Sequence, residues 1–115
     1  MNSISGKVVE GAAKGRLLGY PTANLDTKGH NLDIGCVYHA NVTVDDKTHI
    51  SVLCVNWETV IEVHILDFNE NLYGKTLVLN DIIFLRKMEV IKDEEELRNV
   101  IAKDVQDTRN FYNAD

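Results

Sequence analysis

The chain has 115 residues, of which 44% are hydrophobic, which is enough for one hydrophobic core and too little for two ordinary domains. We therefore expect a single domain over residues 1–115. Twelve basic against eighteen acidic side chains give a net charge of −6. This charge disfavours a protein that binds nucleic acid mainly by electrostatics, because that mode of binding needs a basic face. We predict no nucleic-acid partner, although a local basic patch stays open as an alternative.

The sequence also argues against membrane insertion and secretion. It contains no run of about 18 apolar residues, and its N-terminus has neither a charged segment nor an apolar one. We expect no membrane partner, no signal peptide and a cytoplasmic location. Cys36 and Cys54 belong to no CxxC motif and no Cys/His ligand set. They predict two reduced structural thiols rather than a disulfide or a zinc site.

In chain order, Ile4 to Glu10 predicts a short strand that runs into a glycine-rich loop. Glycine permits close backbone approach to a ligand, and Thr22 and Asn24 can offer side-chain oxygens to a hard cation, so phosphate with magnesium would fit. The alternative is a polar loop with a Pro-Thr turn. The loop is not a Walker loop, because its glycine spacing differs and the Lys-Ser/Thr pair is absent. The candidate ligand-binding residues of this loop are Gly11, Gly15, Arg16, Gly19, Pro21, Thr22 and Asn24.

The middle of the chain predicts a series of short strands. After a turn-rich excursion over residues 26–35, Tyr38 to Val44 alternates apolar and polar residues and forms a predicted hairpin with Ile50 to Val55. Val60 to Phe68 predicts another strand. Thr76 to Leu79, a tight connection at Asn80-Asp81, and Ile82 to Arg86 complete about six strands.

The C-terminal region predicts one amphipathic helix. Asp93 and Glu96 have the spacing of an N-cap with a reciprocating acid, and apolar residues then recur at helical spacing. Glu94 to Glu96 lie in the first turn, where the helix macrodipole favours acids, so helix chemistry explains them better than a metal site does. Many short strands followed by one helix predict a small antiparallel barrel with the helix packed against it.

Glu62 interrupts an otherwise apolar strand in which Ile61, Val63 and Ile65 share one face. It is either the outward member of a half-exposed strand or a general base that faces a cleft and accepts a proton from a substrate hydroxyl. His64 shares the face of Glu62 but is assigned no chemistry. Trp57 can stack on a planar ligand or complete the core, and Tyr73 is expected in the core.

Four stretches resemble the riboflavin kinase family, including the kinase domain of bacterial bifunctional riboflavin kinase/FAD synthetases: Ser5 to Gly11, Gly15 to Leu25, Ile61 to Phe68, and Tyr73-Gly74. The resemblance implies a mainly β fold, a six-stranded antiparallel Greek-key barrel with a C-terminal α-helix. It also implies transfer of the γ-phosphate of ATP to the ribityl terminal hydroxyl of riboflavin, giving FMN and ADP, with Mg²⁺ as the cofactor.

By the same resemblance, Thr22 and Asn24 would hold the metal and the phosphates, the glycine loop with Arg16 would cover the nucleotide, and Glu62 would be the base. The implied partners are riboflavin or FMN and ATP or ADP, with an adenylyltransferase domain in a longer parent chain as a further alternative. The alternative function is a catalytically weak or inactive flavin-binding regulatory module.

One departure from the family concerns the segment from Asn56 to Val60, which is several residues shorter than the family's corresponding loop. That loop would lie near the flavin or the nucleotide. A binding site that lacks one wall buries less of its ligand, so we predict weak flavin binding for this family, a more exposed flavin, and partial compensation by stacking on Trp57.

Overall fold

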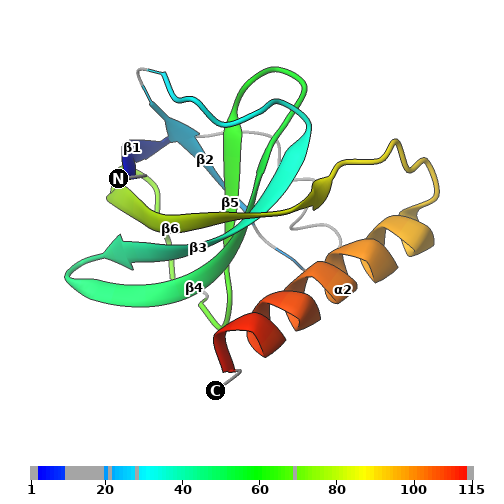
Figure 1. Cartoon of the computed structure of the whole chain (residues 1–115). Coiled ribbons are helices and arrows are strands. Elements are labelled where there is room, and N and C mark those ends of the chain that lie inside the picture. Colours follow the sequence, from blue (N-terminus) through cyan, green and yellow to red (C-terminus); the bar gives the residue numbers. More distant parts are fainter. Residues whose placement is uncertain (1–2, 10–19, 21, 28, 69, 114–115) are drawn as a thin grey trace.

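The structure is a computed structural model that describes residues 3–9, 20, 22–27, 29–68 and 70–113. In this part of the chain, six strands close into one barrel and a long helix lies against its outside (Figure 1). In chain order the elements are β1 (Ile4–Val9), β2 (Ala23–Asp26), β3 (Cys36–Val44), β4 (Lys47–Val55), β5 (Ile61–Ile65), β6 (Thr76–Lys87) and α2 (Glu94–Asn113).

The barrel has the strand order β1-β2-β5-β4-β3-β6, and every pair of neighbouring strands is antiparallel. Strands β3, β4 and β5 follow one another through short connections, and β6 then returns to lie on the other side of β3. The resulting order β6-β3-β4-β5 is a Greek key. The predicted antiparallel Greek-key barrel with a C-terminal helix is therefore confirmed.

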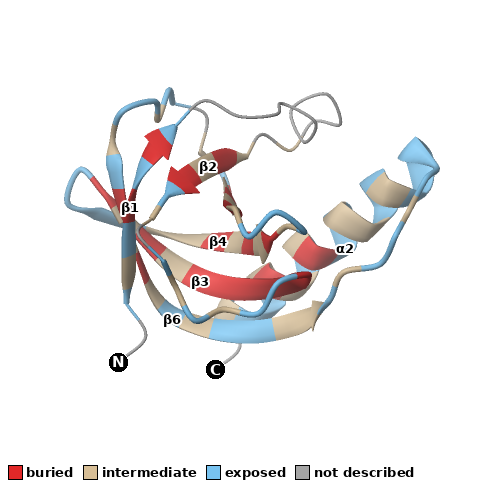
Figure 2. Ribbon diagram, turned by 90° about the horizontal axis from the view of Figure 1, so that it is seen from above, coloured by how far each residue is buried: buried red, intermediate tan, exposed pale blue. Residues whose placement is uncertain are grey.

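Alternating side chains fill the interior of the barrel, as the period of a strand requires. In β5, Ile61, Val63 and Ile65 are buried, whereas Glu62 and His64 between them are half-buried on the outer face. The other strands contribute their own alternating residues to the same core: Val8, Ala23, Leu25, Val42, Leu53, Val55, Leu77 and Leu79. Figure 2 shows buried segments, in red, on β1, β2, β3 and β4.

Two strand predictions were wrong in detail. The tight connection predicted at Asn80-Asp81 does not exist, because β6 is one strand of 12 residues. The register between β3 and β6 shifts between His39 and Asn41, and Asp81 has a φ of 52°, so the two turn-forming residues make a β-bulge instead. The predicted loop around Asn24 contains the strand β2, which pairs with β1 and β5.

One core prediction was also wrong. Tyr73 is 66% exposed, in the turn between β5 and β6, and so it does not belong to the core. Its backbone N–H is held by the side-chain oxygen of Asn71 at 2.9 Å. The Asn-x-Tyr-Gly stretch therefore acts as a polar turn, in which Gly74 has a φ of 82°.

The predicted helix is present, but its two buried side chains are polar. Asp104 and Thr108 are buried in α2, and they contact side chains of β6 and β3 respectively. Arg109 forms a bidentate ion pair with Asp67, two residues beyond the end of β5, with N–O distances of 2.7 and 2.8 Å. In the described residues no helix is long and apolar enough to cross a membrane.

Candidate active site

The predicted site residues divide into two groups. Gly11, Gly15, Arg16, Gly19 and Pro21 lie outside the described residues. Thr22, Asn24 and Glu62 are described, and all three are half-buried.

Strand pairing brings Asn24 and Glu62 side by side. Asn24 in β2 lies directly opposite Glu62 in β5, and Glu62 lies directly opposite Cys54 in β4. Side chains that are directly opposite in an antiparallel pair have Cβ atoms about 4.5–5.5 Å apart. Because the flanking residues Ala23 and Ile61 point into the core, these three side chains form a row on the outer face of the barrel.

Thr22 supplies an unsatisfied polar atom to the same region. Its hydroxyl oxygen is buried and has no hydrogen-bond partner among the described residues. A buried polar atom left without a partner costs about 1–3 kcal/mol, so such an atom in a native fold requires an explanation. Since residues two apart in an extended chain point to the same side, the side chains of Thr22 and Asn24 lie on the same side of this stretch.

The donor set beside Glu62 suits a hard cation that brings its own phosphate ligands. A threonine hydroxyl and an asparagine carbonyl are neutral oxygen donors, which magnesium accepts when substrate phosphates complete its coordination. The described residues contain no group of three or more His, Cys, Asp or Glu side chains arranged to hold a metal ion. The unsatisfied hydroxyl of Thr22 therefore fits a metal–phosphate ligand better than a free metal ion.

Glu62 is held from one side by Asn56, a residue that the sequence analysis did not single out. The side-chain amide of Asn56 donates a hydrogen bond to Oε2 of Glu62, with an N–O distance of 2.9 Å. Asn56 begins the five-residue connection between the end of β4 at Val55 and the start of β5 at Ile61. In the sequence, Asn56 could have been noticed only as a turn-forming residue shortly before the candidate base.

Cys54 occupies the next position of the row, between Glu62 and helix α2. Burial, with the neighbouring Glu62 carboxylate as the second cause, raises the pKa of the Cys54 thiol to about 12. The thiol therefore stays protonated at neutral pH and is a poor nucleophile. Cys36 is buried and both cysteines are free thiols, as the sequence predicted.

His64, which shares the outer face of β5 with Glu62, contacts an aromatic ring at the edge of the site. Its ring centroid lies 5.7 Å from that of Tyr20, with the two rings nearly perpendicular. Tyr20 directly precedes the Pro-Thr-Ala-Asn stretch, so this contact links that stretch to β5.

The short connection that contains Trp57 is covered by the segment 29–35. Trp57 is 61% exposed, and one edge of its ring lies against Gly35. A Cβ atom at Gly35, whose φ is 73°, would lie 2.4 Å from Cζ3 of Trp57, so only glycine fits there. Trp57 is therefore not a core residue, and its other surface is open to a planar ligand.

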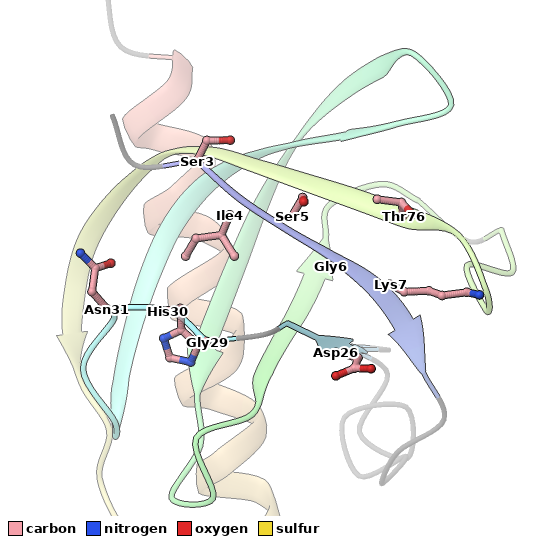
Figure 3. Close-up of a pocket in the computed structure, with 10 residues that line it drawn as sticks. All are labelled: Ser3, Ile4, Ser5, Gly6, Lys7, Asp26, Gly29, His30, Asn31 and Thr76. Atoms are coloured by element: carbon pink, nitrogen blue, oxygen red, sulfur yellow. The ribbon is translucent and has the colours of Figure 1, made fainter.

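A separate polar pocket of about 730 Å³ lies along β1, as Figure 3 shows. Its lining includes Ser5 and Lys7 from β1, Asp26 at the end of β2, and His30 and Asn31 from the following segment. None of Thr22, Asn24 and Glu62 lines this pocket. We place the candidate active site at the row of outer side chains, because the acid and the unsatisfied hydroxyl lie there.

Comparison with known proteins places the chain in a family. The sequence profile of the Flavokinase family, described as riboflavin kinase, matches residues 1–112. The chain is 34% identical over 113 residues to the RNA-binding riboflavin kinase RibR of Bacillus subtilis strain 168, with 91% of this chain and 49% of that protein covered. It is 32% identical over 120 residues to the bifunctional riboflavin kinase/FMN adenylyltransferase of Listeria monocytogenes serovar 1/2a, with 96% and 38% covered. The chain thus spans about half the length, or less, of these curated relatives.

Solved structures share the fold. A macrolide-efflux protein from Streptococcus pneumoniae matches with a TM-score of 0.79 and 28% identity, over 94% of this chain and 38% of that chain. The riboflavin kinase from Trypanosoma brucei matches with a TM-score of 0.71 and 23% identity, over 97% of this chain and 77% of that chain. Both similarities include the barrel and span nearly all of this chain.

Proposed function

The chain belongs to the riboflavin kinase family, and we propose that it transfers the γ-phosphoryl group of ATP to the terminal ribityl hydroxyl of riboflavin. The products are FMN and ADP. The observation that carries the proposal is the position of Glu62, an acid on the outer face of β5 directly opposite Asn24. Phosphoryl transfer mainly requires that the protein position the two substrates and neutralise the charge of the phosphates, with one group to accept the hydroxyl proton.

Glu62 is the proposed base. The ribityl hydroxyl oxygen attacks the γ-phosphorus, the bond between that phosphorus and the leaving oxygen of ADP breaks, and the hydroxyl proton passes to the Glu62 carboxylate. Glu62 is half-buried, so its carboxylate is reached from the outer face of the barrel while its backbone stays fixed in the sheet. A rigid strand holds a base more accurately than a loop does.

Thr22 and Asn24 are the proposed ligands of the phosphates and of Mg²⁺. Support comes from the unpaired Thr22 hydroxyl and from the register that sets Asn24 beside Glu62. When bound, magnesium would neutralise part of the negative charge of the phosphates. We further propose that Gly11, Gly15, Gly19 and Pro21, with Arg16, cover the nucleotide, as the family resemblance implies.

The partners proposed for this chain are riboflavin or FMN and ATP or ADP. The similar Listeria protein is bifunctional, and an adenylyltransferase domain in a longer parent chain belongs to the proposal for that reason. The similar Bacillus protein is described as RNA-binding, which speaks against our prediction of no nucleic-acid partner. The ground for that prediction is the net charge of −6, and a gel-shift titration with RNA tests it.

Product analysis tests the proposed activity directly. The protein is incubated with riboflavin and Mg-ATP, and FMN is separated by chromatography. Formation of FMN in proportion to enzyme and time is the expected result. Binding of riboflavin without any product would instead identify a flavin-binding module, which is the alternative function.

A further inference from the structure

We propose that Asn56 is a positioning residue for the base: it fixes the orientation of the Glu62 carboxylate. The inference rests on the proposed function, because it names a second residue for the same reaction. Its starting point is the hydrogen bond from the Asn56 side-chain amide to Oε2 of Glu62, at 2.9 Å. A hydrogen bond from a donor that is itself fixed holds the carboxylate in one orientation, which a base needs in order to meet the substrate hydroxyl.

The orientation of the Asn56 amide is determined by its surroundings. Its side-chain oxygen accepts hydrogen bonds from the backbone N–H groups of Glu58, at 2.9 Å, and Val60, at 3.1 Å. The opposite orientation would set the amide NH₂ against these two donors and the amide oxygen against the Glu62 carboxylate. The hydrogen bonds therefore require that the NH₂ group faces Glu62.

The backbone of Asn56 is fixed as well. Its N–H donates to the carbonyl of Val60 at 3.0 Å, and its carbonyl accepts from the N–H of Thr59 at 3.0 Å. The backbone of Asn56 thus joins the first residue of the connection to its last two residues. Its side-chain NH₂ group donates to the base. Glu62 itself lies only one residue beyond the start of β5, so hydrogen bonds hold the connection and the base together.

A second layer of contacts holds this connection in place. The ring of His30 accepts the backbone N–H of Leu32 at Nδ1, at 3.1 Å, which leaves its Nε2–H to donate to the carbonyl of Thr59, also at 3.1 Å. The N–H of Gly35 donates to the carbonyl of Val55 at 2.7 Å. The side chain that orients the base is therefore supported by the segment 29–35, which compensates for the shortness of the connection.

The substitution Asn56→Asp separates positioning from turn formation. Aspartate keeps a side-chain oxygen that accepts from Glu58 and Val60, so the turn is preserved. It replaces the donor that faces Glu62 with a second carboxylate oxygen, which repels the Glu62 carboxylate. We expect kcat to fall by about 10-fold or more while the KM for riboflavin changes little, because a displaced base affects the chemical step and not substrate binding.

The matched control is Glu58→Ala, which changes an exposed side chain of the same connection and leaves the backbone donor of Glu58 in place. Its kcat and KM should match those of the wild type, and the melting temperatures of all three proteins should be similar. A merely structural role for Asn56 would lower the melting temperature of Asn56→Asp without a selective loss of kcat. A wild-type kcat in Asn56→Asp would overturn the inference.

A measurement without turnover keeps this test distinct from the test of the proposed function. Side-chain scalar couplings of Glu62 are measured by NMR at neutral pH in wild type and Asn56→Asp. A single Glu62 rotamer in the wild type that becomes averaged in Asn56→Asp supports the contact even if the wild-type protein makes no FMN. Averaged couplings in both proteins, or the same single rotamer in both, would refute it whatever the activity.

Discussion

Glu62 and Asn24 lie on the outside of the barrel because their immediate neighbours are the residues that fill it. Ile61 and Val63 are each 1% exposed, so the side chain between them must point outward. The same alternation applies to Asn24 between Ala23 and Leu25. An acid and an amide can thus be held in the wall of a well-packed barrel without burying charge in its core.

Replacing Glu62 by glutamine tests the base. We expect Glu62→Gln to lower kcat by about 10²- to 10⁴-fold, because proton transfer by a positioned base contributes about that much. The melting temperature and riboflavin affinity should stay close to wild type, since the amide has the same shape. Near-normal kcat would remove Glu62 from the role of base, and a large fall in melting temperature would indicate a structural role.

Replacing Thr22 by valine tests the unsatisfied hydroxyl. The Thr22 oxygen is buried without a partner among the described residues, so its removal should leave the stability of the free protein unchanged or raise it by up to about 1–3 kcal/mol. Binding of Mg-ADP should weaken at the same time, because the phosphates and metal lose a ligand.

Thermal denaturation and calorimetric titration with Mg-ADP measure the two effects of Thr22→Val. Asn24→Ala serves as a companion variant, which should also weaken Mg-ADP binding. Magnesium alone should bind weakly to every variant, since the proposed protein ligands are neutral. Unchanged Mg-ADP affinity in Thr22→Val, or tight binding of free magnesium, would contradict the assignment.

Helix α2 is docked on the barrel by polar contacts beneath its buried face. Arg86 of β6 donates from Nε and Nη2 to the two carboxylate oxygens of Asp104, at 2.8 and 2.7 Å, and Asp104 is only 5% exposed. Nδ1 of His39 in β3 lies 2.7 Å from the hydroxyl of Thr108, and its ring stacks on Phe111 with centroids 4.9 Å apart. A helix docked through buried polar groups is sensitive to their protonation.

The His39 contact predicts acid-sensitive docking of the helix. Burial lowers the pKa of His39 below its ordinary value of 6.5, while Asp107 and Asp104 oppose that change more weakly. As the pH falls through about 6.5, the unfolded chain therefore binds a proton before the folded protein does. The stabilisation is fully present above that pH and is lost as the pH falls toward the lowered pKa of the folded state.

Melting temperatures measured from pH 8 to pH 5 check this prediction. The wild type should lose stability below about pH 6.5, and His39→Asn, which keeps a polar atom near Thr108 but cannot titrate, should lose less over the same range. Parallel pH dependence in the two proteins would show that His39 does not cause the loss.

Across the whole molecule, the segment 29–35 and the connection 56–60 are packed against each other. The Thr59 carbonyl accepts from His30, the Trp57 ring lies against Gly35, and the backbone of Met88 donates to the carbonyl of Gly35 at 2.8 Å. These contacts join parts of the chain that are distant in sequence. They hold Trp57 in place although 61% of it is exposed.

An exposed aromatic ring held in place by the backbone is suited to stacking on a flavin. We predict that Trp57→Ala weakens riboflavin binding by about one to two decades, because stacking of a planar base on an aromatic side chain contributes about 1–3 kcal/mol. Calorimetric titration with riboflavin in the presence of Mg-ADP measures the loss. Tyr73→Ala removes an equally exposed ring from another turn and should bind like wild type. Equal sub-micromolar affinities for wild type and Trp57→Ala would show that stacking on Trp57 is unimportant.

Much of the fold could be predicted because it depends on local patterns. The alternation in β3, β4 and β5 and the helical spacing after Asp93 indicated elements that the structure contains. The candidate base was visible as an acid at an outward position of an apolar strand. Tyr73 was placed wrongly because an aromatic residue in a polar turn has no periodic neighbours that reveal its exposure.

The sequence by itself determined the strand periods, the helix and the chemical types at the site, since these depend on residues a few positions apart. Only the tertiary structure decided that Asn24 lies opposite Glu62, that β6 continues through a bulge, and that Asn56 contacts the base. The physical reason is that a four-residue strand such as β2 has too few residues for a strong local preference. Its place is determined by backbone pairing with β1 and β5, and that pairing exists only once the barrel is closed.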